Sequence, residues 1–122
     1  MNLKDRTNLL KDLCTRIPYG VKCQCLGRIG TVRSIDTFGN TEVEGFSGSI
    51  VIDISHVKPY LFPLSSMTDE QQIEFQQHLI AISDVDVICN IQGYDWLHKN
   101  HIDYRGLIPM ELANDATGLN IY

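Results

Sequence analysis

Two histidines and two aspartates near the C-terminus are the side chains whose types and spacing could support a reaction. His98 and His101 stand three residues apart, and Asp95 and Asp103 flank them. Imidazole nitrogens and carboxylate oxygens together form a common ligand set for divalent metals, and helical residues three apart share a face. These four residues therefore allow a metal-dependent enzyme as one interpretation.

The same residues have a simpler structural interpretation, which we favour. A short helix from Trp96 to about Asn100, capped by Asp95, would leave His98 on a solvated face. His101 would then follow the C-terminus of this helix, where an imidazole interacts favourably with the dipole and the last carbonyl groups. Two histidines with flexible carboxylates do not define a metal site by themselves. We therefore predict no metal and no cofactor.

The same segment is also rich in the residue types that dominate protein interfaces. The predicted interaction residues are Trp96, His101, Asp103, Tyr104 and Arg105. Arg105 could clamp a carboxylate or a phosphate, with Tyr104 as a flat recognition surface. The competing and favoured interpretation is an internal Asp103–Arg105 pair that braces the tail, with Gly106 in a backbone conformation that other residues avoid.

The exposure of Trp96, the only tryptophan in the chain, separates these interpretations. An exposed Trp96 would leave an aromatic patch without a structural purpose and would favour a binding surface. A buried Trp96 would make the segment part of the core, and the function would then lie elsewhere, for example at the edge of the sheet.

The four cysteines form no recognisable metal or redox motif. Cys23 and Cys25 would share one side of a strand and Cys89 could join them, but CxC is neither the CxxC of zinc ribbons nor a redox dithiol. We predict that all four, Cys14 included, are reduced thiols buried as small hydrophobic side chains. The glycines form no phosphate-binding pattern, and no GxSxG or HExxH motif occurs.

Size and composition narrow the class of protein further. The chain has 122 residues, 43% of them hydrophobic and 20% charged, which predicts one folded domain. The net charge of −5 disfavours direct nucleic-acid binding, and an acidic surface could instead meet a basic protein partner. No segment resembles a membrane span or a signal peptide, so we expect a cytoplasmic protein. The oligomeric state stays open, and a structural subunit is a third possible class.

The elements that must position these residues follow from the hydrophobic period. Residues 3–17 predict an amphipathic helix that Pro18 ends. Its predicted apolar face consists of Leu3, Leu10, Leu13, Cys14 and Ile17, and its polar positions include Lys4, Asp5, Lys11 and Asp12. Short strands with glycine-bearing turns then follow at residues 21–25, 30–35, 41–46 and 50–54. This spacing predicts a small bent antiparallel sheet or a barrel of the Src-homology-3 type.

The second half of the chain is predicted to contain helices, one strand and extended segments. Two prolines make residues 56–64 an extended connector that lays Tyr60, Leu61 and Phe62 on the core. Thr68 and Gln71 form a capping box for a helix to about Ile82, which should pack flat on the sheet. The remaining predictions are a fifth strand at 85–91, a helical turn at 107–113, a turn at 114–118 and an extended end at 119–122.

The predicted fold class is therefore α+β, with about five strands in a single domain over residues 1–122. Its parts are an N-terminal helix (1–17), a small sheet or barrel (20–64), and a helical and C-terminal subdomain (65–122).

Three sequence blocks resemble those of a group of small uncharacterised proteins encoded by gut anaerobes, their prophages and their phages. The blocks are KPYLFPLSSMT from Lys58, DWL from Asp95 with HIDYRGLI from His101, and DATGLNIY from Asp115. The resemblance implies a mobile-element accessory protein and carries no catalytic residue. Together with the acidic charge, it predicts a non-catalytic protein that binds a host or phage protein. One version is an inhibitor of a host defence or regulatory complex, bound to a basic groove.

Overall fold

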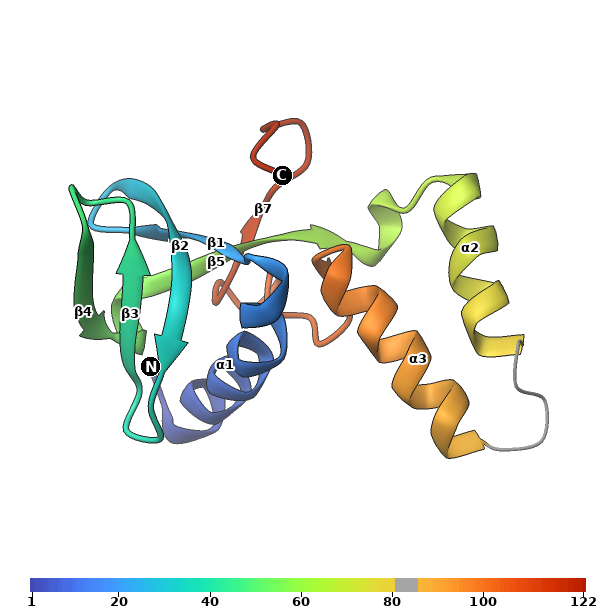
Figure 1. Ribbon diagram of the computed structural model, residues 1–122, viewed down its shortest axis with the longest axis horizontal. Coiled ribbons are helices and arrows are strands. Elements are labelled where there is room, and N and C mark those ends of the chain that lie inside the picture. The colour runs from blue at the N-terminus through green and yellow to red at the C-terminus, as the bar shows by residue number, and fades with distance from the viewer. Residues whose placement is uncertain (81–85) are drawn as a thin grey trace.

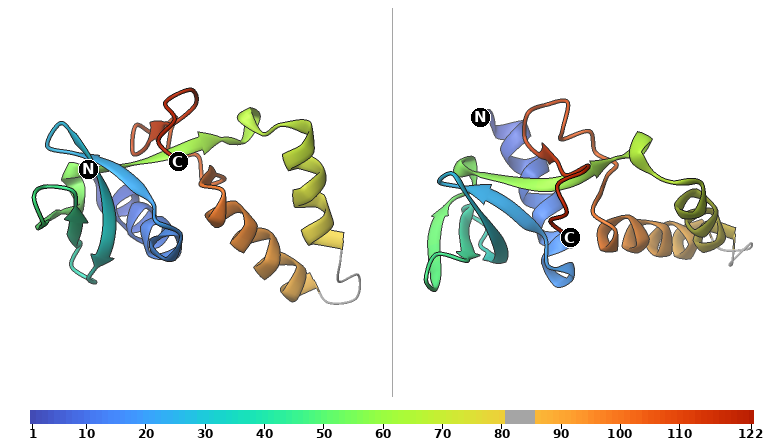
Figure 2. Two further views of the ribbon diagram at one scale, coloured as in Figure 1. Left: turned by 45° about the horizontal axis from the view of Figure 1, so that its top comes forward. Right: turned by 90° about the horizontal axis from the view of Figure 1, so that it is seen from above.

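A computed structural model describes the backbone of residues 1–80 and 86–122, and the side chains of 1–76 and 93–122. It has an N-terminal helix, a mixed sheet and a pair of helices that extends away from the sheet (Figures 1 and 2). The predicted α+β class with an N-terminal helix is confirmed.

Helix α1 (Leu3–Arg16) begins at Asn2, whose side chain accepts a hydrogen bond from the Asp5 amide at 2.8 Å. Pro18 lies in the following 3-10 turn (Ile17–Tyr19), and Gly20 at φ +69° turns the chain toward the sheet. The helix was predicted correctly, but its buried face was not. Leu3 and Cys14 are exposed, whereas Asp12 and Arg16 are fully buried beside Leu9 and Leu13.

The first four strands form an antiparallel meander at the predicted positions. They are β1 (Lys22–Cys25), β2 (Arg28–Ile35), β3 (Asn40–Glu44) and β4 (Ser49–Asp53). Leu26 and Gly27 both have positive φ in the two-residue turn between β1 and β2, as a type I′ hairpin requires. Alternation places Val21, Cys23 and Cys25 together in the core, as predicted.

The predicted extended connector is a strand in the middle of the sheet. β5 (Val57–Pro63) follows a 3-10 turn (Ile54–His56) and pairs antiparallel with β1. It also pairs in parallel with two short strands, β6 (Ile102–Asp103) and β7 (Asn114–Asp115). The strand order is β4-β3-β2-β1-β5-β6, with β7 also on β5, so the path through the described strands is open and does not show a closed barrel.

The main core lies between α1 and the sheet. Its buried apolar side chains come from α1, from β1, β2, β3 and β5, from the turns before β1 and after β4, and from the C-terminal segment. They include Leu9, Leu13, Val21, Cys23, Val32, Val43, Ile54, Leu61, Leu107 and Leu112. Figure 1 shows α1 lying beside the strands, while α2 and α3 stand apart from them.

Helices α2 (Asp69–Ile80) and α3 (Asp86–Lys99) pack against each other and form what we call the arm, residues 69–99 (Figures 1 and 2). The predicted capping box is present, since Thr68 Oγ1 accepts from the Gln71 amide and Gln71 Oε1 accepts from the Thr68 amide. The prediction that α2 packs flat on the sheet is wrong. Its predicted end at Ile82 lies outside the described residues.

The predicted fifth strand is also wrong, because residues 86–91 are the first part of α3, while position 85 lies outside the described residues. A short apolar run with period two does not distinguish a strand from a helix, and Ile88 already broke the alternation. Asp95 lies inside α3 and does not cap a short helix at Trp96. None of the described helices is both long enough and apolar enough to cross a bilayer.

The C-terminal segment returns to the sheet as turns and not as the predicted helical turn at 107–113. Its backbone is tied to β5, because the Ala116 amide donates to the Leu61 carbonyl at 2.8 Å. The Tyr122 hydroxyl donates to the Tyr60 carbonyl at 2.7 Å and accepts from the Lys22 amide at 2.8 Å. The last residue therefore joins β1 and β5.

Candidate functional site

Trp96 belongs to the junction between the arm and the rest of the protein. Only 4% of the residue is exposed, and its ring lies 5.4 Å from that of Phe75 on α2. Leu97 and Ile102 complete this second buried cluster. The Nε1–H group of Trp96 is buried and has no hydrogen-bond partner among the described residues. Trp96 thus holds the arm in place and is not available as an interface residue.

His101 ends α3 and is also buried. Its backbone has φ +57°, the left-handed conformation that commonly follows a helix C-terminus, and its amide donates to the His98 carbonyl. Its ring stacks on Tyr122 at 3.7 Å between centroids. Burial, and then the positive charge of Arg16, lower the pKa of His101 to about 4. The ring is therefore neutral at pH 7, so the predicted position after the helix is right but a charged cap is not formed.

Asp103 organises the turn that follows it. Its two carboxylate oxygens accept hydrogen bonds from the amides of Leu107 and Ile108, both at 2.9 Å. The predicted Asp103–Arg105 pair is wrong, since the Nε atom of Arg105 lies 3.2 Å from Asp12 Oδ1. The prediction for Gly106 is confirmed by its φ of +75°.

The four residues of the metal-enzyme interpretation therefore have separate surroundings. Asp95 is exposed on α3, while His98, His101 and Asp103 each contact different groups. Within the described residues no three His, Cys, Asp or Glu side chains are grouped so that they could hold a metal ion. Cys23 and Cys25 are buried, and burial raises the pKa of the Cys23 thiol to about 12, whereas Cys14 is exposed and the Cys89 side chain lies outside the described residues.

A buried ion pair on α1 is the feature that sequence reasoning missed. Arg16 and Asp12 are both fully buried, and Arg16 Nε donates to Asp12 Oδ2 at 2.8 Å. Arg16 Nη2 also donates to the Ile102 carbonyl at 2.6 Å, which fixes the chain just after α3. The available signal was the spacing of four residues between an aspartate and an arginine on one helix. The prediction that Asp12 lies on the polar side of the helix is therefore wrong.

One carboxylate, that of Asp12, contacts two guanidinium groups, those of Arg16 and Arg105. The three side chains therefore have a net charge of one positive unit. Arg105 lies at the surface, with its guanidinium 5.1 Å from the centre of the Tyr104 ring. It lines a recess of about 260 Å³ with Tyr94, His98 and Tyr104, which we call the Tyr104 recess. His98 Nε2 and the Tyr104 hydroxyl share a hydrogen bond of 2.6 Å. The prediction that His98 lies on a solvated face is wrong, since the residue is only 7% exposed. Burial, and then Arg16, lower the pKa of His98, so this ring also adds no charge at pH 7.

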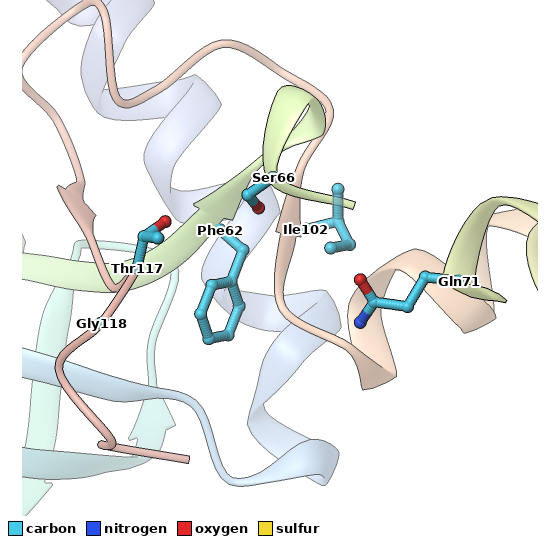
Figure 3. A pocket seen from close by; sticks show the side chains of 6 residues that line it. All are labelled: Phe62, Ser66, Gln71, Ile102, Thr117 and Gly118. Carbon is cyan, nitrogen blue, oxygen red and sulfur yellow. The ribbon is translucent and has the colours of Figure 1, made fainter. Parts of the chain in front are cut away.

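Two further recesses lie close to the same segment. One, of about 310 Å³, also borders Tyr104 and is lined mainly by Pro63, Leu64, Ile108 and Pro109. The second, of about 170 Å³, lies between the C-terminal tail and the start of α2 and is lined by Phe62, Ser66, Gln71, Ile102, Thr117 and Gly118 (Figure 3). The described residues that line this second recess carry no charge, so it offers no electrostatic selectivity.

Tyr104 and Arg105 are therefore the two predicted interaction residues that reach the surface, and Trp96, His101 and Asp103 are structural. The chain matches no family model, and comparison with curated proteins and with solved structures found no match.

Proposed function

We propose that this protein is a non-catalytic accessory protein of a phage or prophage and that it acts by binding another protein. In its most concrete form it inhibits a host defence or regulatory complex by occupying a basic groove. The resemblance to small proteins of gut anaerobes and their phages supplies the mobile-element context for this proposal, and the distribution of charge supplies the physical support.

The arm has all of the net charge of the chain. Residues 69–99 contain six of the 15 acidic residues and one of the 10 Lys and Arg residues, which leaves nine of each in the remainder. The net charge of −5 therefore belongs to the arm, and the remainder is neutral. Asp69, Glu70, Glu74 and Asp95 are exposed. A charged extension on a neutral protein attracts a basic partner and orients it toward one end of the molecule.

The Tyr104 recess offers a second contact for the same function. It lies where α3 meets the rest of the protein. The carboxylate of Asp12 pairs with both Arg16 and Arg105, so the positive charge of Arg105 is not fully neutralised. A partner whose basic surface contacts the arm could place one carboxylate against Arg105. Arginine and tyrosine are enriched among interface residues that contribute most to affinity.

The test is retention of a partner from a lysate of a gut anaerobe at low salt. We expect the immobilised wild-type protein to retain a protein with a basic surface and to release it as the salt concentration rises. The double variant Glu70→Gln with Glu74→Gln removes two charges from the arm and should weaken retention. Glu42→Gln with Glu111→Gln removes two charges from the rest of the protein and should leave retention unchanged.

Two results would overturn the proposal. One is that the wild-type protein retains no partner at low salt. The other is that both double variants retain the partner as well as the wild type, because the charge of the arm would then not matter. Once a partner is identified, the inhibitor version predicts that adding this protein lowers the partner's activity.

A further inference from the structure

The outer edge of β4 is an unpaired strand edge without the usual protection. β4 ends the path of the sheet and pairs only with β3 among the described strands (Figure 1). Natural sheet edges are usually blocked by lysine, proline or a bulge. The sequence of β4 is Ser-Ile-Val-Ile-Asp, and the register shift in the sheet lies between β2 and β3. Such an edge is suited to pairing with another strand.

The hydrogen bonds on either side of β4 show which of its backbone groups point outward. The Gly45 amide donates to the Gly48 carbonyl, and the Ile54 amide donates to the Gly39 carbonyl. Both bonds join residues that lie directly opposite each other when the β3–β4 register is extended by one pair at each end. In an antiparallel ladder, bonded and non-bonded pairs alternate. Even-numbered residues of β4 therefore bond to β3, and the amides and carbonyls of Ser49, Val51 and Asp53 point away from the sheet.

The side chains of this edge present no unpaired charge that would repel a second strand. Val51 is 70% exposed on the outer face of the sheet. Asp53, the only charged residue of β4, is held by Arg6 through two bonds of 2.7 and 2.8 Å. Ile50 and Ile52 point to the opposite face, where they are half-buried against the core.

We propose that β4 pairs antiparallel with β4 of a second copy of this chain, with Val51 on the two-fold axis. Val51 then exchanges both of its outward hydrogen bonds with Val51 of the copy. Ser49 lies opposite Asp53, where a hydroxyl can donate to a carboxylate, and Ile50 lies opposite Ile52. The two inner faces continue into each other, and the half-buried isoleucines gain a shared apolar contact.

A second copy fits this edge better than an unrelated extended segment for two reasons. The outward groups are centred on Val51, so the edge is complementary to itself under a two-fold rotation. No like charges meet across the pairing, and each Asp53 keeps its own Arg6. The pairing also uses the whole length of β4, so it closes as a dimer and does not continue into a fibre.

The test is the mass of the full-length protein in solution, measured by light scattering during gel filtration over a range of concentrations. We expect a species of twice the 13.8 kDa chain mass. Val51→Pro removes an outward amide that β3 does not use, and Val51→Lys places two like charges on the axis. Both variants should be monomeric, with the circular dichroism of the wild type. Ile29→Lys makes the same kind of change at an exposed position of β2 and should remain dimeric.

Hydrogen exchange gives a second measurement that does not depend on a variant. The Ser49 and Val51 amides should become more protected as protein concentration rises, while the Leu26 turn should not change. A monomeric wild type at every accessible concentration would overturn the proposal. A dimer that both folded Val51 variants retain would overturn it as well, because another surface would then form the contact.

Discussion

The sheet with α1 and the arm differ in how they use charged residues. In the first region six charged side chains form internal ion pairs, which are Arg6–Asp53, Arg33–Glu44 and the fully buried Asp12–Arg16. In the arm, Glu70 and its acidic neighbours are exposed, and the ion pairs found within the described residues do not include them. Charge therefore stabilises one region and is left available for contacts in the other.

The contrast extends to the apolar contacts. The sheet and α1 share one core of more than a dozen buried side chains, whereas the arm is attached through the small cluster of Trp96, Leu97 and Ile102. Stability and binding can then be changed separately. We expect substitutions near α1 to affect the whole fold, and substitutions within the arm to act locally.

The largest effect is expected from breaking the buried pair on α1. Asp12→Asn leaves the buried Arg16 without its carboxylate and leaves Arg105 without its ion-pair partner. Removing one partner of a buried pair typically costs about 3–5 kcal/mol. Urea unfolding followed by circular dichroism should show this loss of unfolding free energy. Asp95→Asn, at an exposed position of α3, should stay within about 0.5 kcal/mol of the wild type. If Asp12→Asn and Asp95→Asn lowered the unfolding free energy equally, charged residues would not differ in role between the sheet with α1 and the arm.

The sheet was largely predictable from the sequence because its signals are local. Alternating burial in Val21, Cys23 and Cys25, and glycine at the turns, depend on residues that are neighbours in the chain. The capping box of Thr68 and Gln71 is local in the same sense. The parallel partners of β5 could not be predicted this way, because they lie 40 and 54 positions further along the chain, among turns with no strand period.

The candidate site was predicted only in part for a similar reason. Tyr104 and Arg105 do reach the surface, but the ion-pair partner of Arg105 is Asp12, which lies far away in the sequence. Trp96 and His101 have the same interface-like residue types and are buried. Composition shows which residues can bind, whereas the fold decides which of them face the solvent.

A smaller, pH-dependent effect is expected at His101, where the arm joins the rest of the protein. Its pKa is about 4 in the folded protein because it is buried, against about 6.5 for a free histidine. As pH falls below about 6.5, the unfolded chain takes up this proton first, so stability falls and continues to fall until about pH 4. Between pH 7 and pH 5 this group alone should cost about 2 kcal/mol.

His101→Asn tests this assignment, because asparagine tolerates the left-handed backbone and does not titrate in this range. Its unfolding free energy should decline less between pH 7 and pH 5 than that of the wild type. His56→Asn, at an exposed position, should follow the wild type at both pH values. An unchanged pH dependence in His101→Asn would assign the decline to other groups, of which the buried His98 is the first to examine.

The smallest effect is expected within the arm, at the start of α2. Thr68→Ala removes the oxygen that accepts from the Gln71 amide, and loss of such a cap typically costs about 1 kcal/mol. Because the arm has few contacts with the sheet, this loss should appear as local opening. Hydrogen exchange should show faster exchange at Gln71 and Gln72, with unchanged protection at Val32 and Val43. Thr68→Ser, which keeps an acceptor, should resemble the wild type. If Thr68→Ala lowers protection equally in α2 and in the β2–β3 ladder, the arm and the sheet unfold as one cooperative unit. The separation of stability from binding would then have to rest on charge alone.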